Sequence, residues 1–200
     1  MAEASSVSQL EIHFRGPLCW AGSPQCSSVF SDPAARRRGI YLWTVESDRG
    51  HLVFYVGKTS RTFSVRMREH LKEYLSGMYD IYDISDFREG RRVRLWEGMW
   101  RAGEEVRFAD FLSQHEELWP HLLGMISAMR IHLGAAESNE RVLERIEAGV
   151  ALHLRQPHAP ASEFQNPDVR YRPKSPEEDF VQVSFRSDAT ILGLPDEIQV

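Results

Sequence analysis

The stretch RRRGIYLWTVESDRGHLVFYVGKTSRTFSVRMREH, residues 36–70, decides which fold the sequence predicts. Its two runs, GIYLWTVE (39–46) and HLVFYVG (51–57), are rich in β-branched and aromatic residues, and the turn-forming SDRG separates them. This pattern predicts a β-hairpin whose strands are covered on both faces, because the runs are almost continuously hydrophobic. From about Ser60 the apolar residues recur at helical spacing, so we expect a helix directly after the hairpin.

Four side chains of this stretch are candidates for chemistry. An odd number of turn residues would place Tyr41 opposite Tyr55 on one face of the hairpin, whereas an even number would send them to opposite faces. On the helix, Arg66 and His70 lie one turn apart at the border of the apolar stripe, where a guanidinium can bind phosphate oxygens. The alternative for each is structural: tyrosines that stabilise a sheet, a surface arginine and a histidine at the edge of the core.

The rest of the chain predicts further elements around this centre. QLEIHF (9–14) and FVQVSF (180–185) alternate in hydropathy, and we expect them to pair as a small second sheet. RVRLWEG (92–98) is the candidate third strand of the main sheet. Residues 105–133 are expected to be helical, and residues 138–155 form the clearest helix of the chain.

These elements suggest one central domain with two extensions. We place an N-terminal strand and loop at residues 1–38 and the central domain at 39–155, with an insert at 78–137. Residues 156–200 are expected to form a proline-rich connection and a final strand that packs on the same domain.

Glu147 lies on the apolar face of the 138–155 helix, the face formed by Leu143, Ile146, Val150 and Leu154. A carboxylate in a buried stripe is costly unless it is paired, hydrogen-bonded or bound to a cation. Two interpretations follow: a salt bridge to a buried arginine, or a ligand for Mg²⁺, which is often bound by one or two carboxylates.

Charge and composition restrict the classes of partner. The net charge is −5, but residues 34–107 hold 15 Lys and Arg against 11 Asp and Glu, a local balance of +4 that can attract phosphates. Arginines that are merely solvated are the alternative explanation of this excess. No apolar run approaches the roughly 18–20 residues of a membrane span, so we expect no membrane partner.

The cysteines and the start of the chain point to a reducing compartment. Cys19 and Cys26 do not have a zinc-binding spacing, and we expect two free thiols. The first residues show no basic segment followed by an apolar one, so we expect no secretory signal and a cytoplasmic protein.

Together the motifs resemble the GIY-YIG nuclease superfamily. The triplet GIY (39–41) is followed by YVGKT (55–59), then by Arg66 with His70 four residues later, and then by a late helix with an inward Glu147. Members of this family include homing endonucleases, the incision subunit of bacterial nucleotide-excision repair and some restriction enzymes. The resemblance covers roughly residues 39–166 and implies an α+β fold, with a three-stranded antiparallel sheet flanked by helices.

The resemblance also implies a role for each matched residue. Tyr41 and Tyr55 would be the active-site tyrosines, Arg66 would contact the phosphate and Glu147 would bind the metal. The family also has an asparagine after the late helix, which would correspond to Asn166. The remaining matched residues are Gly39, Gly57, Lys58 and His70. Gly57 would allow close backbone approach, and Lys58 or the metal would lower the pKa of Tyr41 so that it can accept a proton from water.

The activity implied is that of a metal-dependent endonuclease that hydrolyses phosphodiester bonds in DNA, with one Mg²⁺ or Mn²⁺ per site. RNA remains an alternative substrate. A second alternative is a nucleic-acid-binding or protein-interaction module that keeps the fold without catalysis. The sequence indicates neither the specificity nor the oligomeric state.

Overall fold

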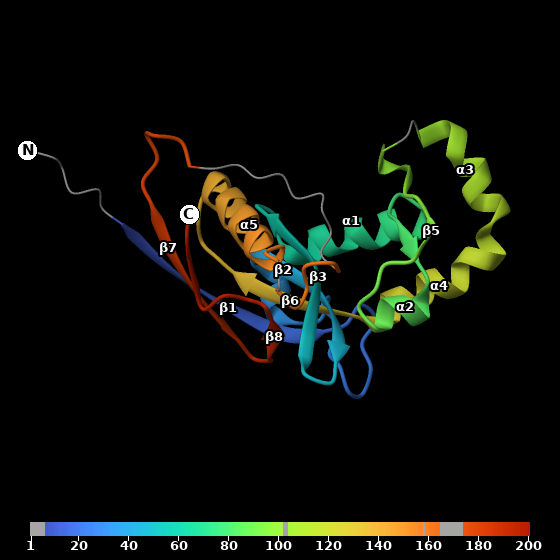
Figure 1. Ribbon diagram of the computed structural model, residues 1–200, viewed down its shortest axis with the longest axis horizontal. Coiled ribbons are helices and arrows are strands. Elements are labelled where there is room, and N and C mark those ends of the chain that lie inside the picture. The colour runs from blue at the N-terminus through green and yellow to red at the C-terminus, as the bar shows by residue number, and fades with distance from the viewer. Residues whose placement is uncertain (1–6, 102–103, 158, 165–173) are drawn as a thin grey trace, which may run out of the picture.

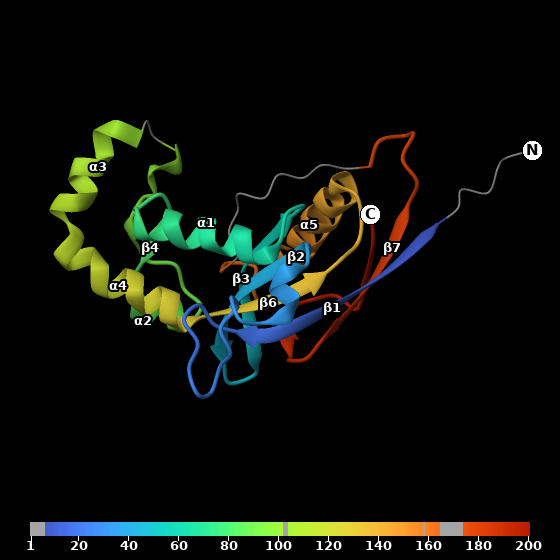
Figure 2. The same ribbon diagram turned by 180° about the vertical axis from the view of Figure 1, so that it is seen from behind.

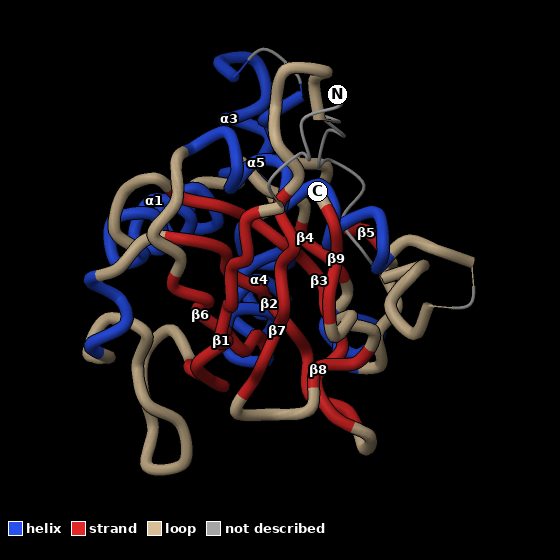
Figure 3. The backbone as a smooth tube through the Cα atoms, turned by 90° about the vertical axis from the view of Figure 1, so that its left-hand side faces the viewer, coloured by secondary structure: helices blue, strands red, loops and turns tan. Residues whose placement is uncertain are grey.

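A seven-stranded mixed sheet forms the centre of the molecule and curls along its length (Figures 1 and 3). The computed structural model describes residues 7–101, 104–157, 159–164 and 174–200. The strand order is β8-β3-β2-β6-β1-β7-β9. The bounds are β1 Ser8–Leu18, β2 Gly39–Ser47, β3 Gly50–Thr59, β6 Met129–Ala135, β7 Val181–Ser187, β8 Ile191–Leu192 and β9 Glu197–Gln199.

The expected three-stranded antiparallel sheet is wrong, and so is the separate small sheet of terminal strands. Strands β3, β2 and β6 are antiparallel neighbours, but the sheet continues through β1, which pairs antiparallel with β6. β1 also pairs in parallel with β7, so the terminal strands extend the main sheet. They do so because Ile12, Phe14 and Val183 are fully buried against the same core as β2.

The third strand beside the hairpin also differs from the expected one. RVRLWEG contributes only β5 (Arg94–Trp96), which pairs with β4 (Ile81–Tyr82) in a separate two-stranded sheet. The strand next to β2 is β6, which lies in the range expected to be helical. The periodicity of a short apolar run such as MRIHLGA is compatible with either a strand or a helix. Here the run forms a strand because it pairs with β2 on one side and with β1 on the other.

The described part of the chain contains five α-helices and two short 3₁₀ helices. The α-helices are α1 Phe63–Leu75, α2 Ile84–Arg88, α3 Glu104–Ser113, α4 His115–Ala128 and α5 Glu140–Leu154, and the 3₁₀ helices are Pro33–Arg36 and Met99–Arg101. The helix expected at 138–155 is confirmed as α5, which begins where the Asn139 side chain accepts a hydrogen bond from the Val142 amide. None of the described helices is both long and apolar enough to cross a membrane.

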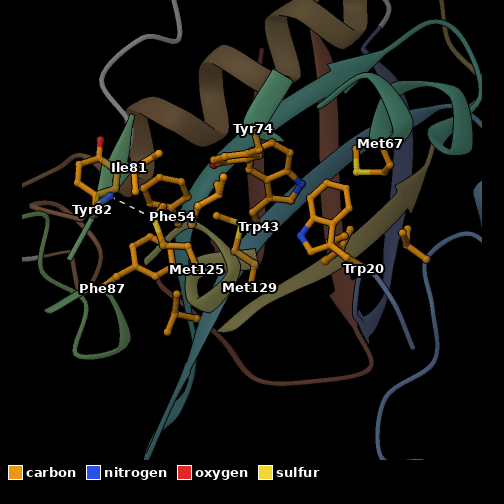
Figure 4. Close-up of a cluster of buried hydrophobic side chains, with 14 of the residues drawn as sticks. Trp20, Trp43, Phe54, Met67, Tyr74, Ile81, Tyr82, Phe87, Met125 and Met129 are labelled. Atoms are coloured by element: carbon orange, nitrogen blue, oxygen red, sulfur yellow. Dashed lines mark hydrogen bonds between the residues drawn. The ribbon is translucent and has the colours of Figure 1, made fainter. Parts of the chain in front are cut away.

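The two faces of the sheet bury separate hydrophobic cores. On one face α5 packs against β2, β3 and the terminal strands, with Leu42, Val56 and Leu143 fully buried. On the other face lie α1 and the insert, and Trp43 packs in a cluster that also includes Trp20 (Figure 4). The insert helices α2, α3 and α4 lie at one end of the molecule and β7 lies toward the other (Figure 2).

A β-bulge in the hairpin sets the positions of its tyrosines. The turn between β2 and β3 has two residues, Asp48 and Arg49, an even number that alone would place the tyrosines on opposite faces. The register shifts between Trp43 and Thr44, however, because β3 contains one extra residue. Beyond this bulge Tyr41 pairs with Gly57 and Trp43 pairs with Tyr55. Both tyrosines therefore lie on the same face.

Candidate active site

Tyr41 is the buried centre of the candidate site. Its side chain is fully buried on β2, and its hydroxyl oxygen lies 2.6 Å from Nε2 of His70 on α1. Gly57, opposite on β3, makes room for this phenol, because a Cβ atom at that position would lie 2.4 Å from the Tyr41 hydroxyl. The hairpin glycine thus allows the tyrosine to approach the strand closely.

Tyr55 lies beside Tyr41 and is partly exposed. The two ring centroids are 6.1 Å apart, and the Trp43 ring contacts both tyrosines. Burial, and then the neighbouring Tyr55 hydroxyl, hold the pKa of Tyr41 well above its usual value, whereas the charge of Arg66 acts to lower it. The Tyr41 hydroxyl is therefore protonated at neutral pH.

Arg66 places its positive charge against this pair of hydroxyls. Burial lowers its pKa, but interaction with Tyr41, first by charge and then by hydrogen bonding, outweighs that effect and leaves the pKa above the usual range. Arg66 also donates to Glu69, one turn away, over 3.4 Å, and its side chain is 28 % exposed. A guanidinium that is fixed on one side and open on the other is suited to bind phosphate oxygens.

His70 connects the tyrosine to a second set of polar groups. Its side chain is 1 % exposed, and burial lowers its pKa to about 4, so the imidazole is neutral at neutral pH. Its Nδ1 atom lies 2.7 Å from the Tyr79 hydroxyl, which in turn donates a hydrogen bond to Glu73. Both ring nitrogens are thus engaged with tyrosine hydroxyls.

Glu147 extends from α5 to the backbone of β3. Its Oε1 atom accepts a hydrogen bond from the Lys58 backbone N–H over 2.9 Å. Burial raises its pKa to about 7, although the Lys58 N–H, the Lys58 charge and the Arg66 charge all oppose that rise. In the described part of the chain Glu147 is held by this backbone amide, and no salt bridge joins it to an arginine.

A divalent cation fits the chemistry of this carboxylate. A carboxylate whose ionised form is disfavoured by burial gains from a bound cation, and carboxylate oxygen is the ligand type that Mg²⁺ prefers. The described residues contain no group of three or more His, Cys, Asp or Glu side chains that could hold a metal together. The arrangement therefore suits a cation that takes one ligand from the protein and the others from water and phosphate.

Lys58 does not face Tyr41. Its Nζ atom lies 2.6 Å from Glu140 and 3.5 Å from Glu144, both on α5. Among the described residues, Arg66 is the cation that acts on the Tyr41 hydroxyl. Lys58 therefore does not have the expected effect of lowering the pKa of Tyr41. Its ion pairs instead hold α5 against β3.

Gly39 serves the sheet and has no contact role in the cluster. Gly39 has a φ of +145°, and a Cβ atom there would lie 2.2 Å from the Gly134 carbonyl oxygen, so this glycine permits the pairing of β2 with β6. Asn166 lies outside the described residues.

Two residues of the cluster, Glu73 and Tyr79, were not identified from the sequence. Glu73 follows His70 by three residues, which places both on one face of α1, and this spacing was a usable signal. Tyr79 comes from the start of the insert, and nothing in the sequence pattern links it to His70. The structure brings Tyr41, Tyr55, Arg66 and His70 together with this pair, and Glu147 acts on Tyr41 through its charge.

Comparison with known proteins adds no assignment, since the chain matches no family model, no curated protein and no solved structure.

Proposed function

We propose that this protein is a divalent-metal-dependent phosphodiesterase of the GIY-YIG type that cleaves DNA internally. One observation carries the proposal: a buried tyrosine hydroxyl, Tyr41, lies within 2.6 Å of the neutral His70 and within the electrostatic reach of both Arg66 and Glu147. These residues come from β2, α1 and α5, and each has a distinct role in phosphodiester hydrolysis.

Tyr41 and His70 supply the path for a proton. A neutral tyrosine is a weak base, but it can accept a proton from an attacking water if it passes its own proton to His70 in the same step. The neutral imidazole is available for this because burial keeps its pKa at about 4. Tyr55 borders the same space and offers a second hydroxyl to the substrate.

Arg66 and Glu147 supply the charges. The guanidinium would neutralise negative charge that develops on the non-bridging oxygens of the phosphate. Glu147 is the residue that would hold a Mg²⁺ or Mn²⁺ ion, which polarises the phosphate and stabilises the leaving oxygen when bound. The Lys58 amide fixes the orientation of this carboxylate through its hydrogen bond to Oε1.

DNA as the substrate rests on the location of the basic residues. Residues 34–107, with a balance of +4, build the hairpin, α1 and the first half of the insert, which are the elements around the site. A local positive balance beside the catalytic groups favours a polyanion over a small neutral substrate.

The proposal is tested by nicking of supercoiled plasmid with Mg²⁺, Mn²⁺ or EDTA. The wild-type chain is expected to nick the plasmid only with a divalent metal, and Glu147→Gln, Tyr41→Phe and Arg66→Ala should each lose at least about 100-fold in rate. Circular dichroism checks that each variant is folded. Nicking that is unaffected by EDTA, or equally fast in Glu147→Gln, would show that the assignment is wrong. A labelled RNA duplex in the same assay decides between DNA and RNA.

A further inference from the structure

The hydrogen bonds beyond His70 have only one consistent direction. An ionised carboxylate accepts hydrogen bonds and donates none, and interaction with His70 holds the pKa of Glu73 below its usual value, so this carboxylate is ionised at neutral pH. The Tyr79 hydroxyl has one hydrogen, which it donates to Glu73. Tyr79 can therefore only accept from His70, and the proton of the neutral imidazole must reside on Nδ1.

This direction determines what Tyr41 does. With its proton on Nδ1, His70 presents a bare Nε2 lone pair, so the Tyr41 hydroxyl must donate across their 2.6 Å contact. A tyrosine that already donates to a base is prepared to release its proton in that direction. The opposite tautomer would make His70 a donor to Tyr41 and would block this transfer.

We propose that Glu73 and Tyr79 are positioning residues that hold His70 in the Nδ1–H tautomer and stabilise its charged form during the reaction. This inference rests on the proposed phosphodiesterase function. In the transfer step, the O–H bond of water breaks and Tyr41 gains that proton, while the Tyr41 proton moves to Nε2 of His70. The hydroxide attacks phosphorus, the bond from phosphorus to the ester oxygen breaks, and that oxygen takes a proton from solvent. His70 later releases its proton through Tyr41 to solvent, which restores the starting state.

Burial makes the charged imidazole costly, and Glu73 offsets this cost. Burial, and to a lesser extent the charge of Arg66, act to lower the pKa of His70, whereas interaction with Glu73 acts to raise it. The carboxylate lies 3.6 Å from Nδ1 in addition to its link through Tyr79. Glu73 thus favours the protonated state in which His70 would receive the Tyr41 proton, and Tyr79 links the two side chains.

Tyr79 also gives the insert a defined part in the site. It lies between α1 and β4, and Tyr74 of α1 packs against it with a ring separation of 4.8 Å. The first residues of the insert are therefore built into the hydrogen-bonded chain behind His70 instead of forming a separate surface module.

The test is the protonation of the His70 ring, read by long-range ¹H–¹⁵N spectra of the full chain at neutral pH. The His70 signal is assigned by its loss in His70→Gln. Wild type is expected to show the Nδ1–H tautomer. In Glu73→Gln the new amide can donate to the Tyr79 oxygen, which frees the Tyr79 hydrogen for Nδ1, and the ring should convert to the Nε2–H tautomer. Glu73→Asp should retain the wild-type tautomer.

Plasmid nicking provides the second readout. Glu73→Gln should lower the maximal rate by about 100-fold, because the tautomer then blocks proton transfer, and Glu73→Asp should recover much of it. The matched controls are Glu89→Gln, an exposed carboxylate that pairs with Arg91, and Tyr82→Phe, whose hydroxyl bonds to Asp80 and not to His70. Both controls should nick at the wild-type rate.

Two results would overturn the inference: an Nε2–H tautomer in the wild-type protein, or a Glu73→Gln variant whose tautomer and rate are unchanged. If wild type cleaves no nucleic acid with any divalent metal, the proposed function fails. The ring spectra of wild type and Glu73→Gln then still decide whether Glu73 orients His70, so the two failures are distinguishable.

Discussion

Three neighbours define the chemistry of the Tyr41 hydroxyl. His70 lies within hydrogen-bond distance of it, Arg66 places a positive charge beside it, and Gly57 leaves the space in which its ring lies. Burial alone makes the phenol a poor acid, so the proposed role depends on His70 being neutral and oriented. The proposed role of the Tyr41 hydroxyl thus needs both the space left by Gly57 and the proton path through His70.

The space requirement is tested by Gly57→Ala. The added methyl group would lie 2.4 Å from the Tyr41 hydroxyl, so the ring must move and its hydrogen bond to His70 must lengthen or break. We expect a loss of at least about tenfold in nicking rate. The control is Gly124→Ala on α4, where the methyl group would meet Ile84 at 2.6 Å, away from the site. Crowding there should lower the melting temperature without lowering the rate; equal losses in both variants would contradict the local role of Gly57.

The bulge in the hairpin and the packing of α5 against β3 determine where the residues of the candidate site lie. The extra residue in β3 turns Tyr55 to the face of Tyr41 despite the even turn, and the Lys58 amide and ammonium both bond to glutamates of α5. β3, which carries Tyr55 and Gly57, and α5, which carries the proposed metal ligand Glu147, are therefore linked at one position, Lys58.

Lys58→Ala separates the structural from the catalytic role of this lysine. Its ammonium pairs with the exposed Glu140 and, at a longer distance, with Glu144, so removing it should lower the melting temperature only slightly. The backbone N–H that binds Glu147 remains in the variant. We expect a loss in nicking rate that is smaller than that of Arg66→Ala. A rate as low as that of Arg66→Ala would restore Lys58 as the cation that acts in catalysis.

The sequence predicted the elements whose local pattern is unambiguous. The hairpin and α5 follow from β-rich runs around a turn and from a capped amphipathic stretch, and both are present. Residues 129–133 were expected to end a helical region, but they belong to β6, whose short apolar run has no decisive period. The face shared by the tyrosines depends on a bulge that leaves no mark in the sequence, and Tyr79 reaches His70 only through tertiary packing.

At the scale of the whole molecule, the sheet separates two cores, and one of them contains buried histidines outside the candidate site. His132 on β6 is fully buried, and its ring lies 4.9 Å from that of His51. The Thr44 hydroxyl lies 3.1 Å from Nε2 of His132, and the Nδ1 atom has no hydrogen-bond partner among the described residues. Burial, and then the neighbouring His51, lower the pKa of His132 to about 3.

This burial predicts a loss of stability in acid. Because the folded-state pKa of His132 lies below its ordinary value of about 6.5, the unfolded chain binds a proton that the folded chain does not. Its contribution to stability is complete above about pH 6.5 and is lost as the pH falls toward about 3. Urea unfolding at pH 7.5 and 4.5 should show a smaller difference in His132→Gln than in wild type. The exposed-site control His115→Gln should keep the wild-type difference; an unchanged difference in His132→Gln would refute the prediction.

The most direct test of the central claim is whether Tyr41 and Glu147 act on the same phosphodiester. The measurement is the single-turnover rate of plasmid nicking with saturating Mg²⁺ by Tyr41→Phe, by Glu147→Gln and by the double variant. Residues that act as one unit give losses that are far from additive, so the double variant should be about as slow as the slower single variant. Losses that multiply, or either single variant nicking at the wild-type rate, would contradict a shared active site.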